Sequence, residues 1–84
     1  MNDTISDTTL IMVGPRYTSR AKLSELRKYL MAVEGAEEVV TIGGHKGRRI
    51  DLFVRMKIDV WKDWRKYRDI KDTIRKHPDV AYVE

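Results

Sequence analysis

The ten residues from 49 to 58, R-I-D-L-F-V-R-M-K-I, alternate between polar and apolar side chains with a single exception. The even positions are all aliphatic or methionine: Ile50, Leu52, Val54, Met56 and Ile58. The odd positions are Arg49, Asp51, Phe53, Arg55 and Lys57. An alternation of this length predicts a β-strand that turns one face toward a core. It also places Phe53 alone among charged side chains on the opposite face.

Three further segments have the composition of strands. Val39, Val40 and Ile42 precede the loop G-G-H-K-G at 43–47, so we expect this segment and residues 48–58 to form a hairpin. The segment 9–13 is apolar or β-branched and is closed by a Gly-Pro pair at 14–15, and the segment 80–83 is a short apolar run near the end of the chain.

Two stretches have helical periodicity. The first begins at a cap, Thr18 or Ser19, and we expect Gly35 to end it; its apolar positions are Leu23, Leu26, Leu30 and Val33. In the second, we expect Asp59 to cap the helix and His77-Pro78 to stop it. Its stripe contains Trp64, Tyr67 and Ile74, which we expect to pack in the core, while Trp61 lies off the line and is a candidate anchor for a partner.

The predicted order is strand, helix, strand, strand, helix, strand. Because crossover connections are right-handed, both helices fall on the same face of the sheet. The sequence therefore predicts an α+β, ferredoxin-like βαββαβ fold, a four-stranded antiparallel sheet with two helices on one face. We expect residues 1–8 to be a flexible tail and residues 9–84 to form a single domain. Regulatory, RNA-binding and phosphatase-like domains share this plan, so it does not select a function.

The composition of the chain excludes several classes of protein. The chain has 84 residues, no cysteine, and a net charge of +4 from 17 basic and 13 acidic side chains. A disulfide framework and thiolate chemistry are excluded. The apolar runs of the chain, such as 10–13, are far shorter than the roughly 20 residues of a membrane span. We expect a soluble cytoplasmic protein with no membrane partner.

The sequence contains no set of residues with the types and spacing of a known catalytic site, so we expect a protein that is not an enzyme and has no cofactor. The loop at 43–47 matches neither nucleotide-binding glycine pattern, and no helix follows it. His45 and His77 are far apart in sequence and lack the spacing of a metal site. Asp51 stands between Arg49 and Arg55, a charged setting rather than the apolar one that suits a catalytic general base.

The sequence offers three candidate binding features. Residues 43–57 carry five cations against Asp51 alone, which is typical of a surface for an RNA or DNA backbone or an acidic partner; the cations are Lys46, Arg48, Arg49, Arg55 and Lys57. Phe53 and Trp61 are candidate interface residues. Arg16 and Arg20, beside the amino end of the first helix, are a candidate anion site.

Two hypotheses stay open. The first is a non-enzymatic regulator that associates with nucleic acid or nucleoprotein through the basic hairpin and the sheet face. The alternative is a protein-protein interaction module, either a homodimeric regulator or a small inhibitor of a larger protein, acting through the semi-apolar sheet face. The alternative rests on the segment 9–13, whose apolar side chains alternate to both faces and leave Leu10 and Met12 opposite the helices.

Overall fold

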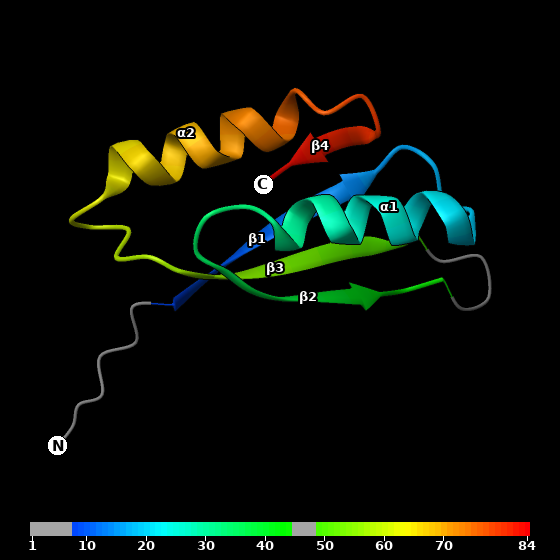
Figure 1. Ribbon diagram of the computed structural model, residues 1–84, viewed down its shortest axis with the longest axis horizontal. Coiled ribbons are helices and arrows are strands. Elements are labelled where there is room, and N and C mark those ends of the chain that lie inside the picture. Colours follow the sequence, from blue (N-terminus) through cyan, green and yellow to red (C-terminus); the bar gives the residue numbers. More distant parts are fainter. Residues whose placement is uncertain (1–7, 45–48) are drawn as a thin grey trace, which may run out of the picture.

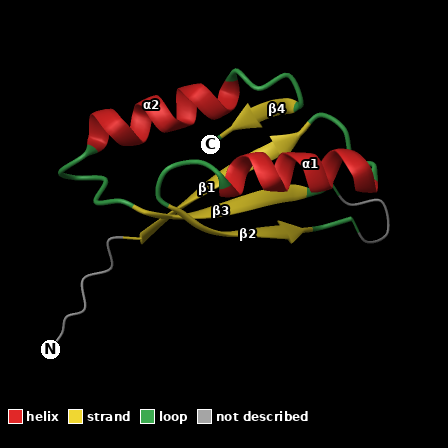
Figure 2. Ribbon diagram, viewed as in Figure 1, coloured by secondary structure: helices red, strands yellow, loops and turns green. Residues whose placement is uncertain are grey.

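The alternating segment forms an inner strand of the sheet. The structure is a computed structural model that describes residues 8–44 and 49–84. Its elements are β1 (Thr8–Pro15), α1 (Arg20–Met31), β2 (Ala36–Ile42), β3 (Asp51–Lys57), α2 (Trp64–Arg75) and β4 (Val80–Val83). The four strands make one antiparallel sheet in the order β2-β3-β1-β4 (Figure 1). Both helices lie on one side of it (Figure 2), which confirms the ferredoxin-like βαββαβ fold.

The core lies between the sheet and the helices. Leu52, Val54 and Met56 of β3 are completely buried, as the alternation predicted. Side chains from every other element complete a single cluster: Ile11, Val13, Leu26, Leu30, Val39, Ile58, Ile74, Val80 and Val83. Burial of this set stabilises the fold by removing apolar surface from water.

Strand β1 is central and pairs on both sides. Met12 faces Phe53 of β3, and Val13 faces Val83 of β4. The last residue, Glu84, donates its N–H to the Met12 carbonyl at 2.9 Å. The predicted strand at 9–13 thus extends to Thr8 and Pro15, while residues 1–7 of the expected tail lie outside the described part of the chain.

Helix α1 begins where its cap was expected. The Ser19 hydroxyl accepts a hydrogen bond from the N–H of Lys22 at 3.3 Å. The expected end was wrong, because the helix stops at Met31 and Ala32 is its C-cap. Gly35 lies in the turn that leads to β2, where its carbonyl accepts the N–H of Lys57 at 2.8 Å.

Helix α2 begins five residues later than Asp59, the expected cap. One Asp59 carboxylate oxygen accepts the N–H groups of Trp61, at 3.0 Å, and Lys62, at 3.1 Å. Asp59 therefore caps a separate turn, and the helix starts at Trp64 after Asp63, whose φ of −111° and ψ of 38° are not helical. Trp61 consequently lies outside the helix.

The expected burial of the aromatic stripe was wrong for Trp64, whereas Trp61, which was expected to lie off the stripe, is indeed exposed. Trp61 is 93% exposed and Trp64 is 49% exposed, whereas Tyr67 is partly buried against the core. Ile74 is the only residue of α2 that is fully buried. The carboxyl end of α2 thus supplies its deepest contact with the sheet, and the amino end is open to solvent.

Candidate functional site

The face of the sheet opposite the helices carries apolar side chains that no described residue covers. We call this surface the open face and define it by Leu10, Met12, Val40, Ile42 and Phe53. Leu10 is 60% exposed, Ile42 is 53% exposed and Val40 is 40% exposed, while Met12 and Phe53 are partly exposed. In the strand register Phe53 lies opposite Met12 on one side and Val40 on the other. The patch is therefore continuous across β1, β3 and β2.

Charges of both signs border one end of the open face. Arg55 lies between Leu10 and Glu38 in the strand register. Its guanidinium is 3.2 Å from the Glu38 carboxylate and 3.5 Å from that of Glu37. Both glutamates reach the same arginine because β2 has an irregular register between Ala36 and Glu38.

The other end is bordered by a contact that crosses β1. The Tyr82 hydroxyl of β4 donates a hydrogen bond of 2.5 Å to the Asp51 carboxylate of β3. This bond and partial burial raise the pKa of Tyr82 above its usual value. Arg49 lies 3.7 Å from the same carboxylate, with its guanidinium 5.3 Å from the centre of the Tyr82 ring.

Gly14 makes that contact sterically feasible. A Cβ atom at this position would lie 2.0 Å from Cε1 of Tyr82, so the ring occupies the space that any other side chain would need. Sequence reasoning missed Tyr82 and Asp51 as partners. The available signal was a glycine in a central strand, which often marks a close approach of another group.

The structure distributes the cations of the predicted basic hairpin over separate places. Lys46 and Arg48 lie outside the described residues. Arg49 and Arg55 each lie beside carboxylates and are six positions apart, a distance of roughly 20 Å along an extended chain. Lys57 is exposed at the far end of β3. Gly43 of the hairpin loop has a steric role as well, since a Cβ at this position would lie 2.0 Å from the Arg49 carbonyl oxygen.

The two candidate interface residues occupy different parts of the molecule. Phe53 lies at the centre of the open face, opposite Met12 and Val40. Trp61 lies in the turn that leads to α2, and this helix packs on the other side of the sheet (Figure 1). Each residue therefore belongs to its own surface.

Arg16, one of the two residues of the candidate anion site, uses its guanidinium in hydrogen bonds to backbone carbonyls. Its Nε donates to the Pro78 carbonyl at 3.1 Å, and one terminal nitrogen donates to the Val80 carbonyl at 3.3 Å. Arg16 thereby ties the end of β1 to the beginning of β4. Arg20 is the exposed first residue of α1, and an anion site there stays a prediction.

The amino end of α2 forms a second polar and aromatic surface. The guanidinium groups of Arg65 and Arg68 each lie 5.3 Å from the ring centre of Trp64. The Lys71 ammonium lies 5.2 Å from the ring centre of Tyr67. Distances of this size are those of cation-π pairs, which hold the cationic groups beside the rings.

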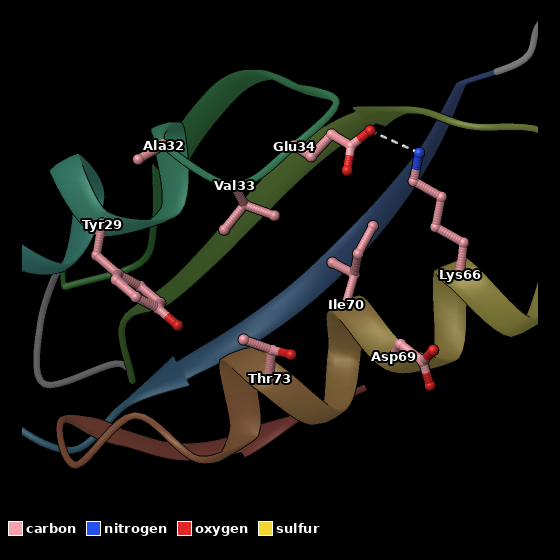
Figure 3. A pocket seen from close by; sticks show the side chains of 8 residues that line it. All are labelled: Tyr29, Ala32, Val33, Glu34, Lys66, Asp69, Ile70 and Thr73. Carbon is pink, nitrogen blue, oxygen red and sulfur yellow. Dashed lines mark hydrogen bonds and ion pairs between the residues drawn. The ribbon is translucent and has the colours of Figure 1, made fainter.

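A groove of about 590 Å³ separates the two helices. Tyr29 and Val33 line one wall, and Ile70 and Thr73 of α2 line the other (Figure 3). Lys66 and Glu34 bridge one end with a contact of 2.6 Å, which raises the pKa of Lys66. The groove is mainly apolar.

Three remaining features of the structure concern possible metal ligands, the length of the helices relative to a membrane span, and the contacts of His77. Among residues 8–44 and 49–84, no three histidine, cysteine, aspartate or glutamate side chains gather as metal ligands. No helix in this part of the chain is long and apolar enough to cross a bilayer. His77 has structural contacts, since its ring packs 4.4 Å from that of Tyr29 and its Nδ1 accepts the N–H of Asp79 at 3.0 Å.

Comparison of the chain with models of protein families gave no match, and comparison with curated proteins and with solved structures gave none either.

Proposed function

We propose that this chain is a protein-protein interaction module that pairs with a second copy of itself through the open face of its sheet. The observation that carries the proposal is the continuous apolar patch on three adjacent strands. Leu10, Val40 and Ile42 each leave 40% or more of their surface in water. Contiguous exposed apolar surface of this kind marks interaction sites, because association removes it from water.

The borders of the patch favour a second copy as the occupant. One border carries Arg55 with Glu37 and Glu38, and the other carries Arg49 with Asp51. Each border thus contains both positive and negative side chains, so a partner of strong net charge gains little electrostatic attraction from it. A two-fold axis through the patch brings apolar centre to apolar centre and lets the arginine of one copy meet the glutamates of the other.

Nucleic-acid association through the basic hairpin is the second candidate and stays a prediction. The regional excess of cations motivates it. It ranks below self-association because Arg49 and Arg55 already have carboxylate neighbours, which reduces what a phosphate would gain from them.

Sedimentation velocity over a wide range of protein concentration tests the proposal. The wild-type chain is expected to move from monomer to dimer as concentration rises. Phe53→Asp places an uncompensated charge at the centre of the patch and is expected to keep the chain monomeric. Because Phe53 is only partly buried, this variant is expected to retain its circular dichroism spectrum.

Trp61→Asp is the matched control, since it introduces the same charge at an exposed aromatic residue outside the open face. It is expected to dimerise like the wild type. A wild-type chain that stays monomeric at the highest concentration, or a folded Phe53→Asp variant that dimerises unchanged, would contradict the proposal. Dimerisation lost equally in both variants would mean that the open face alone does not form the interface and would also contradict the proposal.

A further inference from the structure

The segment that contains α2 carries a charge excess on the helical side of the molecule. Residues 61–76 contain seven basic and three acidic side chains, whereas the remainder of the chain contains ten of each. The whole net charge of +4 thus equals the charge of this one segment. Such an excess on one helix attracts polyanions.

The two arginines next to Trp64 differ from those on the sheet. Arg49 and Arg55 each have a carboxylate within 4 Å. In the part of the chain that the structure describes, Arg65 and Arg68 have no such carboxylate and instead lie 5.3 Å from the centre of the same indole ring. Held beside an indole rather than neutralised by an acid, these guanidinium groups keep their capacity to bind phosphate.

Both tryptophans of the chain belong to this surface. Trp61 is 93% exposed, and its turn is ordered by the two hydrogen bonds that Asp59 accepts from the backbone. Trp64 follows three residues later and is half exposed. The exposed ring of Trp61 and the two arginines beside Trp64, three and more residues further along the chain, supply the two components of a single-stranded nucleic acid site, stacking for the bases and positive charge for the backbone.

We infer that Trp61, Trp64, Arg65 and Arg68 form a binding surface for single-stranded nucleic acid, with Lys62 beside them. Trp61 stacks on a base, while Arg65 and Arg68, held beside Trp64, contact phosphates of the same strand. A membrane surface fits less well, because Ile70 and Ile74, the aliphatic side chains of α2, face the core and leave no apolar helix face for lipid. An acidic peptide would use the cations but would leave the exposed indole without a stacking partner.

Fluorescence anisotropy with a labelled oligothymidine of about twenty nucleotides tests the inference. The wild type is expected to bind, with an affinity that falls as the salt concentration rises. A plot of the logarithm of the binding constant against the logarithm of the salt concentration is expected to have a slope of about −0.7 for each phosphate contact. Quenching of the indole emission is expected to follow the same curve, because base stacking perturbs the tryptophans directly.

Four variants separate stacking from bulk charge. Trp61→Ala is expected to weaken binding about tenfold or more, and Trp61→Phe is expected to retain most of it, because an aromatic face is kept. Arg65→Gln with Arg68→Gln is expected to lower affinity by at least about tenfold and to flatten the salt slope. Arg27→Gln with Lys28→Gln removes the same charge from exposed positions on α1 and is expected to change affinity by less than about threefold.

Three results would overturn the inference. One is no binding of oligothymidine by the wild type at low salt. Another is equal weakening by the α1 and α2 double variants, which would show attraction by net charge alone. The third is full binding by Trp61→Ala together with equally effective competition by polyglutamate, which would assign the surface to an acidic protein partner. Because the surface lies away from the open face, the dimerisation experiment is decided independently of all three.

Discussion

The Tyr82 hydroxyl joins β4 to β3 across the intervening strand β1 and fixes one border of the open face. Its hydrogen bond to Asp51 is possible because Gly14 of β1 leaves space for the ring. The bond requires the protonated phenol, since a phenolate cannot donate to a carboxylate. This requirement gives the residue a defined dependence on pH.

Tyr82→Phe is expected to lower the free energy of unfolding by about 1 kcal/mol near neutral pH, through loss of one hydrogen bond. The folded-state pKa of Tyr82 is raised, so the bond contributes fully below the unfolded-state pKa of about 10. The contribution is lost as pH rises through the folded-state pKa. Urea unfolding at near-neutral and at strongly alkaline pH measures the change.

The wild type and Tyr82→Phe are therefore expected to differ in stability near neutral pH and to converge in alkali. Tyr17→Phe is the control, because Tyr17 is 49% exposed and the Lys22 ammonium lies over its ring, 5.6 Å from the ring centre. A stability difference for Tyr82→Phe that grows with pH would contradict the role assigned to the hydroxyl.

At the level of elements, α2 contacts the core through a narrow part of its surface. Ile74 is completely buried, whereas Trp64, the largest side chain of the helix, is half exposed. The stability that α2 gains from packing therefore depends on its second half. Its first half is available to contact other molecules.

Ile74→Ala is expected to destabilise the fold by about 2 to 5 kcal/mol, because it leaves a cavity in the core. Trp64→Ala removes a larger side chain but is expected to cost less than about 1 kcal/mol, the range of an exposed cation-π contact. Chemical unfolding of the two variants gives the comparison. A greater loss of stability for Trp64→Ala would mean that the indole, not Ile74, anchors the helix.

The elements differ in how far sequence alone predicts them. Strand β3 was predicted because its alternation requires one face to be buried, whatever the rest of the chain does. The predicted start of helix α2 was too early. Asp59 accepts backbone N–H groups as a cap does, but it caps a separate turn, and the non-helical backbone of Asp63 divides this turn from the helix. Periodicity also cannot say which end of an amphipathic stripe reaches the sheet, since that depends on where the helix docks.

The same limit applies to the binding surfaces. Phe53 and the exposed position of Leu10 follow from the strand pattern, so the open face was foreseeable. The neutralisation of Arg55 depends on the register of β2 against β3, including its irregularity at Ala36 to Glu38. The contact between Tyr82 and Asp51 joins residues 31 positions apart. Gly14 signals a close approach at the central strand, but it does not identify which residues make the contact.

At the scale of the whole molecule, the two proposed surfaces lie on opposite sides of the sheet. The open face is formed by β1, β3 and β2, and the tryptophan and arginine surface is formed by α2 and the turn before it (Figure 1). Pairing of two copies through the open face leaves both α2 helices turned outward. A dimer would then present two equivalent surfaces to one polyanion, which increases affinity through effective concentration.

Isotope-filtered nuclear Overhauser spectra of a mixture of labelled and unlabelled chains test self-association through the open face most directly. The expected result is a set of intermolecular contacts from the Phe53 ring to the methyl groups of Leu10, Met12 and Val40, whose register places them around it. Absence of intermolecular contacts at concentrations that saturate any association, or contacts confined to α2, would contradict it.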